Sequence, residues 1–382
     1  MAWDDDEARV EFQWLSFMAA YKYDDYRDYH AGARFIESLA VWLQQFEQVD
    51  RRIAYEFIKH DLVYFSPAEI QRLVEKFFPE HVQCDLIDKV AKNLNIPKFK
   101  IWASEENTEE YRWERRKTLF MGLSDGARID ALRRMNVGII SNEQVVIATQ
   151  IDHYKWSNLL NKLCDELSKI RNTEIKNEKF SRVYLIDDFT ASGTSLLRES
   201  NGTLKGKLIK FLDSVKSATT YLNDNSPFIQ GFDIVVHHYI GTEQAKENIE
   251  ELYTRRKEYF HDMKVKSIQF KYGMLLSSNL RIDGTSSHPF TALCKKYYDN
   301  AIEGDGKHGV QSGTTDKMFG YANCGMPVVI EHNTPNNSLP LIWAETSENN
   351  DNHCMKPLFR RRERHSDMDQ NQMNYSNGDL DE

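Results

Sequence analysis

The sequence predicts an α/β protein in which a parallel sheet is flanked by helices, with a helical N-terminal region before it and a C-terminal cap after it. Three observations lead to this prediction. Residues 8–95 contain few glycines and long stretches in which apolar side chains recur at helical spacing. From Pro97 to about residue 285, short β-type runs alternate with helical ones, which indicates βαβ units. Beyond residue 285 the pattern loosens into turn-rich segments.

In the N-terminal region, residues 33–46 place apolar side chains at i, i+3, i+4 and i+7, which predicts an amphipathic helix. The run Ser66-Pro67-Ala68-Glu69 is typical of a helix start, with Ser66 as N-cap, Pro67 at the first helical position and Glu69 completing a capping box. We expect this helix to end at Phe78, because Pro79 follows.

The sheet is predicted from short apolar runs, and the run 183–186 is apolar throughout, as in a strand buried on both faces. Helices are expected at 156–170 and 243–258. The predicted strands, in chain order, are 119–123, 143–149, 183–186, 232–239, 267–272 and 327–330.

Composition excludes several classes of protein. The chain has 382 residues, of which 41% are hydrophobic, so wholesale disorder and collagen-like structure are excluded. Its net charge of -9 argues against a protein that coats nucleic acid. No apolar run approaches the roughly 20 residues of a membrane span, and the acidic N-terminus is unlike a signal peptide. We therefore expect a cytoplasmic protein with no membrane partner. Five scattered cysteines without a Cys-x-x-Cys pair fit neither a disulfide framework nor structural zinc: Cys84, Cys164, Cys294, Cys324 and Cys354.

The segment richest in chemistry follows the predicted strand 183–186. Two carboxylates, Asp187 and Asp188, end the strand, and a loop of small and hydroxyl residues precedes a helix that we expect to start near Ser195. Ligands of open α/β sheets bind at the carboxyl ends of strands, and a loop that opens a helix suits a phosphate. The carboxylates suit neutral donors such as ribose hydroxyls, or a divalent metal. The loop consists of Thr190, Ala191, Ser192, Gly193, Thr194 and Ser195.

This segment resembles the phosphoribosyl-pyrophosphate loop of the type I phosphoribosyltransferases, and the resemblance implies their fold. It implies that Asp187 and Asp188 hold the ribose hydroxyls and that residues 190–195 cradle the 5′-phosphate. It also implies Mg²⁺ as cofactor, bound through the pyrophosphate of the substrate and by Asp187 and Asp188. The sequence departs from the purine-specific members at Ala191, where those proteins carry an acid that assists the nucleobase.

A second loop follows the predicted strand 119–123 and has the order and character of the family's pyrophosphate loop. It consists of Ser124, Asp125, Gly126, Ala127 and Arg128, and Arg128 would pair with a phosphate. An ordinary βα turn explains the same residues equally well. A mobile loop over the donor is a third feature of the family, and residues 149–156, with Lys155, or residues 171–180 would serve.

Residues 320–343 carry a wider resemblance, to the phosphoribosyltransferase-like proteins of bacterial conflict and anti-phage gene clusters (PRTase-CE). The specific part is the run Asn-Thr-Pro-Asn-Asn-Ser at 333–338, and the resemblance extends over about residues 10–345. In such a fold the C-terminal segment lies over the active site, so four side chains are expected to read the acceptor: His332, Asn333, Asn336 and Asn337. The alternative is a structural turn whose amides bond to their own backbone.

From these features we expect a phosphoribosyltransferase-like effector of a bacterial anti-phage system that uses phosphoribosyl pyrophosphate, or a related sugar phosphate, and an unknown acceptor. The acceptor classes that remain open are bases, nucleotides, nucleic acids and proteins, and defence proteins or nucleic acid are also candidate partners. A non-catalytic nucleotide-sensing module and a hydrolase of nucleotide glycosidic bonds are the alternatives, and the oligomeric state, a homodimer included, stays open. The expected segments are a helical region 1–95, the transferase-like core 96–285, a cap 286–346 and a charged, disordered tail 347–382.

Overall fold

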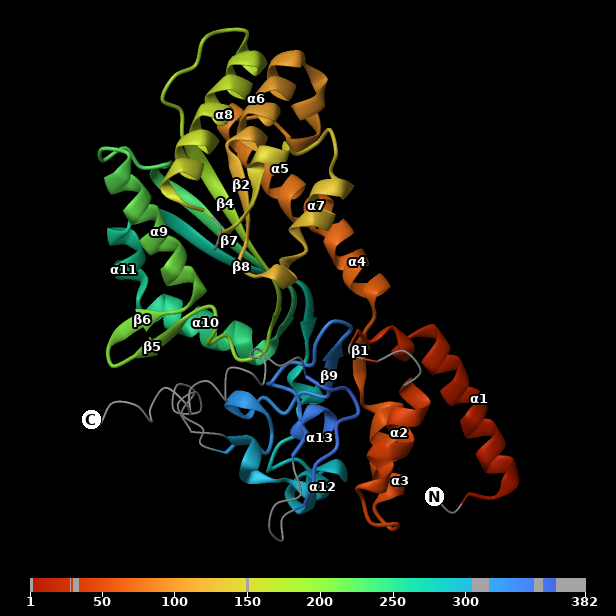
Figure 1. Ribbon diagram of the computed structural model, residues 1–382. Helices are drawn as coiled ribbons and strands as arrows, with labels where there is room; N and C mark the ends of the chain where they lie inside the picture. The colour runs from red at the N-terminus through yellow and green to blue at the C-terminus, as the bar shows by residue number, and fades with distance from the viewer. Residues whose placement is uncertain are drawn as a thin grey trace, which may run out of the picture. The chain divides into compact units, whose positions relative to one another are not determined.

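The computed structural model describes residues 3–27, 29, 34–148, 151–303, 316–346 and 353–361. The chain divides into two compact units (Figure 1). One unit is continuous and comprises residues 68–279, and the other combines residues 1–67 with the chain from Leu280 onward.

The continuous unit contains a five-stranded sheet in which every neighbouring pair of strands is parallel, as predicted. The strand order is β3-β2-β4-β7-β8, so the predicted buried strand lies at the centre. The apolar run Val183–Ile186 occupies this central position because its side chains are buried on both faces of the sheet. The strands are β2 (Thr118–Gly122), β3 (Val145–Ile147), β4 (Phe180–Thr190), β7 (Phe228–Thr242) and β8 (Val265–Leu276).

Helices cover both faces of this sheet. On one side lie α8 and α9, and on the other lie α4, α5 and α7 (Figure 1). Side chains such as Leu163, Leu212 and Ile249 form the core of the first face with alternate residues of the strands. The helices of this unit are α4 (Pro67–Lys76), α5 (Gln83–Leu94), α6 (Glu105–Arg116), α7 (Ile129–Met135), α8 (His153–Arg171), α9 (Lys207–Tyr221), α10 (Glu243–Arg255) and α11 (Lys257–Asp262).

The helix that begins at Pro67 does not stop before Pro79. A π-helical turn, Phe77–Val82, carries the chain into α5. Proline lacks an N–H and its ring collides with the carbonyl four residues earlier, and the wider π turn accommodates both defects. The turn also places Phe77 against the sheet, with its ring 5.6 Å from that of Tyr184.

The prediction that a helix starts near Ser195 is also wrong. A short hairpin of β5 (Arg198–Ser200) and β6 (Thr203–Lys205) intervenes, and α9 begins only at Lys207. Asn201 and Gly202 form the hairpin turn with positive φ angles of 51° and 73°. An Asn-Gly pair is the strongest short-range hairpin signal, and here it overrides the helical character of the preceding leucines.

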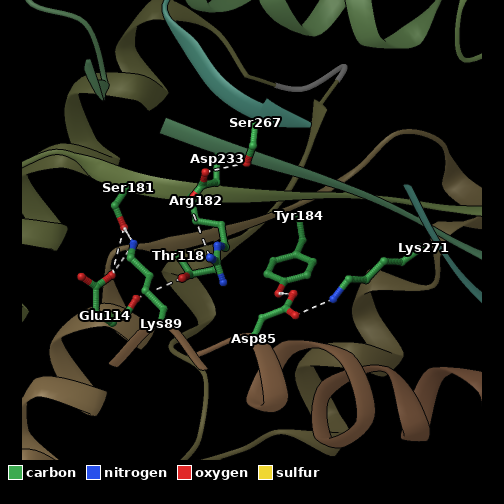
Figure 2. A network of polar contacts seen from close by, with 10 residues as sticks. All are labelled: Asp85, Lys89, Glu114, Thr118, Ser181, Arg182, Tyr184, Asp233, Ser267 and Lys271. Carbon is green, nitrogen blue, oxygen red and sulfur yellow. Dashed lines mark hydrogen bonds and ion pairs between the residues drawn. The ribbon is translucent and has the colours of Figure 1, made fainter. Parts of the chain in front are cut away.

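A polar network ties helices α5 and α6 to strands of the sheet (Figure 2). Lys89 of α5 donates to Glu114 of α6 at 2.7 Å and to Ser181 of β4 at 3.0 Å. Asp85 of α5 accepts from Tyr184 and Lys271, both at 2.5 Å. These bonds anchor α5 and α6 on the sheet, near the start of β4 at Ser181 and midway along β4 and β8 at Tyr184 and Lys271.

The second unit joins the two ends of the chain in one core. Trp42 Nε1 donates to the Leu341 carbonyl at 2.6 Å, and the rings of Phe57 and Phe290 stack 3.8 Å apart. A two-stranded parallel sheet pairs β1 with β9. The elements are α1 (Asp5–Tyr21), α2 (Phe35–Gln44), α3 (Arg51–His60), β1 (Val63–Phe65), α12 (Phe290–Tyr297), β9 (Val328–Ile330) and α13 (Pro340–Trp343).

These units cut across the segments expected from the sequence. Helices α4 and α5, expected in the N-terminal region, pack in the unit of the sheet, and the expected cap shares its core with α1–α3. Within the tail that was predicted to be disordered, residues 353–361 are packed: Met355, Leu358 and Phe359 are buried in that core. The many charged residues of the tail led to the prediction of disorder, whereas these three apolar side chains pack segment 353–361 into the core. The rest of the tail lies outside the described residues.

Candidate functional site

The carboxyl ends of β2 and β4 bring the two predicted ligand loops together. Gly122 and Ile186 are register partners in these neighbouring strands, and Leu123 N donates to the Ile186 carbonyl at 2.8 Å. The loop that begins at Ser124 therefore starts beside Asp187. Sequence reasoning predicted each loop separately, and the pairing of the strands places them side by side.

Asp187 is enclosed at the centre of this site. Its carboxylate accepts a hydrogen bond from Ser124 Oγ and forms an ion pair with Lys207 Nζ at the start of α9. The residue is only 2% exposed. Burial and the neighbouring charge of Asp188 raise the pKa of Asp187, and the ammonium of Lys207 and the hydroxyl of Ser124 oppose that rise.

Asp188 points to the other face of the strand, since successive side chains alternate. It is half-buried and lies against the backbone of the second loop: a Cβ atom at Gly126 would lie 2.6 Å from Asp188 Cγ. Tyr239 of β7 donates to the Ala127 carbonyl at 3.2 Å and fixes the same loop. Burial raises the pKa of Tyr239, the charge of Asp188 raises it further, and that of Arg128 opposes the rise. The loop therefore presents its small residues to the partly exposed carboxylate.

The loop 190–195 is held from behind by α10. Thr242 Oγ1 donates to the Ala191 carbonyl at 2.7 Å, and Asn248 Nδ2 donates to the Ser192 carbonyl at 3.0 Å. Gly193 has a φ of +79°, and a Cβ atom there would meet Ile249 Cγ1 at 2.7 Å. Only glycine satisfies both the left-handed backbone and this close approach.

The polar side chains of this loop differ in their surroundings. The hydroxyls of Ser192 and Thr194 bond to each other at 2.9 Å. Thr190 Oγ1 is buried and has no hydrogen-bond partner among the described residues. The carbonyl of Ser195 accepts from the backbone N–H of Lys207 at 2.9 Å, which ties the loop to α9.

Lys207 is the site residue that sequence reasoning missed. It lies beyond a hairpin, twelve positions after the loop ends, and a lysine at the start of a helix carries no motif. The Asn-Gly turn is the signal that would have revealed the hairpin and hence the true start of α9.

His237 and His238 point to opposite faces of β7, as alternation requires. The ring of His237 lies 4.6 Å from those of Phe77 and His81. His238 is the register partner of Asp187, and burial, aided by the charge of Lys207, lowers its pKa to about 3. A neutral His238 therefore lies beside the enclosed carboxylate.

The described residues hold no cluster of three or more His, Cys, Asp or Glu side chains suited to a metal ion. Mg²⁺ needs no such cluster in phosphate chemistry, because it takes one or two carboxylates together with substrate phosphates and water. The half-buried carboxylate of Asp188, which accepts a hydrogen bond from the Phe189 N–H at 2.9 Å, is compatible with that role, and the more deeply buried Asp187 is engaged by Lys207 and Ser124. The donor set is therefore compatible with an ion carried mainly by the ligand.

The turn after β9 belongs to the other unit. The Asn337 amide is buried and donates to the Tyr321 carbonyl at 3.0 Å, so it ties this turn to the segment that precedes β9. His332 Nδ1 lies 3.3 Å from the buried carboxylate of Glu331. His332, Asn333 and Asn336 are partly exposed, and acceptor binding by residues of this turn stays a prediction.

The two candidates for a mobile loop also stay predictions. Residues 149–150 lie outside the described residues, and Lys155 is in the first turn of α8, where its N–H donates to Asp152 at 2.7 Å. Residues 172–179 connect α8 to β4. No helix in the described ranges combines the length and apolar character that a bilayer crossing requires.

Comparisons with known proteins complete the picture. Neither the comparison with curated proteins nor the comparison with solved structures gives a match. A family model, PRTase-CE, matches residues 39–361 and so spans both units and both loops of the site. The α/β architecture with a parallel central sheet agrees with a phosphoribosyltransferase-like fold. The chain belongs to the PRTase-CE family of phosphoribosyltransferase-like proteins.

Proposed function

We propose that this protein is a phosphoribosyltransferase that binds phosphoribosyl pyrophosphate with Mg²⁺ and transfers ribose 5-phosphate to an acceptor, as an effector of anti-phage defence in bacteria. Membership of the PRTase-CE family supports the transferase-like class. The observation that carries the proposal is the meeting of the 124–128 loop with Asp187 and Asp188 at the carboxyl edge of the sheet.

The arrangement suits a displacement at C1′ of the ribose. The C1′–O bond to pyrophosphate breaks, the acceptor forms a bond to C1′, and the acceptor loses a proton to water or a nearby base. Asp187 and Asp188 would hold the ribose hydroxyls, and the loop 190–195 would hold the 5′-phosphate. The 124–128 loop lies beside Asp188, where the leaving group would depart.

Catalysis here would rest on charge stabilisation, which needs no covalent nucleophile. When bound, Mg²⁺ would neutralise negative charge on the pyrophosphate, with Asp188 as its ligand from the protein. Arg128 adds a cation to the same loop, in a left-handed conformation with φ of 50°. The protein's part is to position the ribose against these charges.

A specific observation favours a second candidate, a phosphoribosyl-sensing module without turnover. Asp187 is enclosed by Ser124 and Lys207, and Ala191 offers a methyl group where an acid would assist a nucleobase. The enclosed Asp187 and the methyl group of Ala191 permit the donor to bind. Neither of them supplies a group that moves a proton to or from an acceptor. Binding of the donor without product would favour this candidate.

The test is pyrophosphate release from phosphoribosyl pyrophosphate and Mg²⁺, with and without cell extract. We expect release that is lost in the double variant D187N/D188N. The matched control is D213N/D262N, which removes the same charge from two exposed aspartates of α9 and α11 and should release pyrophosphate like the wild type. Release that survives D187N/D188N would refute the assignment. Tight donor binding by calorimetry with no release under any acceptor would replace it with the sensing module.

The acceptor and the defence role need separate measurements. Mass spectrometry of the nucleic-acid and protein fractions after expression should find a ribosyl-phosphate adduct that is missing from cells expressing D187N/D188N. Ribose 5-phosphate in place of an adduct would identify water as the acceptor, whereas free base released from added nucleotides would identify a glycosidic-bond hydrolase. Plaque counts on cells that express either form test the anti-phage role, and equal counts would contradict it.

A further inference from the structure

Lys207, the first residue of α9, lies against the loop 190–195, to which the proposed function assigns phosphate binding. Its backbone N–H donates to Ser195 O at 2.9 Å, and the next N–H, of Leu208, donates to Leu196 O at 3.1 Å. At Gly206, φ is +122° and a Cβ atom would lie 2.7 Å from the carbonyl carbon of Leu196. The turn before α9 therefore lies directly on the loop backbone, so the loop fixes the position of Lys207.

These bonds change how the site can attract an anion. The first N–H groups of a helix have no partner within the helix and are the groups that bind a phosphate at a helix start. In α9 the first two donate to loop carbonyls instead. The ammonium of the Lys207 side chain adds a full positive charge at the start of α9.

A cation at the start of α9 lowers the electrostatic cost of bringing a phosphate beside two carboxylates. Asp187 and Asp188 are adjacent carboxylates, and a sugar phosphate would add further negative charge beside them. An ammonium has three N–H donors, and the structure shows the Lys207 ammonium paired with Asp187. The Lys207 side chain remains 32% exposed, which leaves donors accessible from solvent.

We propose that Lys207 bridges the carboxylate of Asp187 and the phosphate of the bound ligand, and that this bridge makes the site select phosphorylated sugars over free sugars. This inference rests on the proposed function of the same site. It assigns to one residue both the neutralisation of Asp187 in the free protein and the recognition of phosphate in the complex.

The test is calorimetry on the full chain with three probes: ribose 5-phosphate, ribose and inorganic phosphate. In D187N the ammonium of Lys207 no longer faces a carboxylate, so inorganic phosphate should bind about tenfold more tightly or better, as expected for a charged hydrogen bond. In D187N/K207Q that gain should disappear. Removal of both partners together leaves no unpaired buried charge, which preserves the fold, and a thermal melt verifies this.

The control is K210Q, which removes an exposed lysine one turn further along α9 and should bind every probe like the wild type. If the wild type binds ribose 5-phosphate but D187N and D187N/K207Q bind phosphate equally, the inference falls and the proposed function stands. If no form binds ribose 5-phosphate or inorganic phosphate, both fall. A wild type that binds ribose as tightly as ribose 5-phosphate would also overturn the inference.

Discussion

The backbone of Gly126 packs on the carboxyl group of Asp188, and a Cβ atom at position 126 would lie 2.6 Å from Asp188 Cγ. This contact joins the second predicted loop to the partly exposed acid. It explains why a residue without a side chain stands at this point of the loop.

Substitution of Gly126 by alanine should therefore displace Asp188. The colliding group is the end of a side chain, so it can move, and we expect a loss of about 1 kcal/mol or less in the free energy of unfolding. Affinity for ribose 5-phosphate should fall at least tenfold, because the carboxylate leaves its place. Calorimetry and thermal denaturation measure both effects. Gly284→Ala, where the nearest atom would be at 3.5 Å, is the control, and unchanged affinity in G126A would contradict the role of this contact.

Gly193→Ala should be costly for the loop 190–195. It adds the strain of a left-handed backbone, about 1 kcal/mol, and a collision with Ile249 that adds about 1–3 kcal/mol. Gly202→Ala is a matched control, since its φ is also positive at 73° but nothing lies within 4 Å of the added atom. Denaturant unfolding should therefore rank G193A clearly below G202A. Equal stabilities would show that the loop does not pack on α10 in this way.

The buried His237 predicts a loss of stability in acid. Neither of its ring nitrogens has a hydrogen-bond partner among the described residues, and burial holds its pKa well below the usual value. The unfolded chain then binds the extra proton as the pH falls below about 6.5, so stability decreases with falling pH. In H237F this contribution is absent, and the loss between pH 7 and pH 5 should be smaller by about 1–2 kcal/mol.

Urea unfolding of both forms at the two pH values measures this difference. The control is His261→Phe, at an exposed position of α11, which should follow the wild-type pH dependence. Parallel pH dependence of H237F and the wild type would contradict the assignment of the acid sensitivity to His237.

Substitutions of two neighbouring asparagines in the turn after β9 should have different effects, one on stability and the other on acceptor binding. Asn337→Ala removes a buried amide that donates to the Tyr321 carbonyl, and this should cost about 1–3 kcal/mol of stability. Asn336→Ala removes a partly exposed side chain and should leave stability within about 0.5 kcal/mol. If Asn336 reads the acceptor, its loss lowers adduct formation in cells while the melting temperature stays constant. Equal stability of the two variants would contradict the assignment of Asn337 to the turn.

Much of the candidate site is visible in the sequence because its parts are local. The apolar run before Asp187, the pair of acids and the small residues with Gly193 follow one another along the chain. The second loop also has a local pattern, but its meaning was open between a ligand loop and an ordinary turn. The pairing of β2 with β4 places Ser124 on Asp187, and the ligand role of this loop stays a prediction.

Other features depend on contacts between distant segments. Lys207 reaches Asp187 only because a hairpin delays the start of α9, and Phe359 joins the core of Phe35 across most of the length of the chain. The sequence by itself determined the alternation of strands and helices and the composition of the Asp187–Ser195 segment, since these depend on neighbouring residues. The tertiary structure decided which segments share a core and which cation faces Asp187, because those depend on the packing of surfaces that no local pattern records.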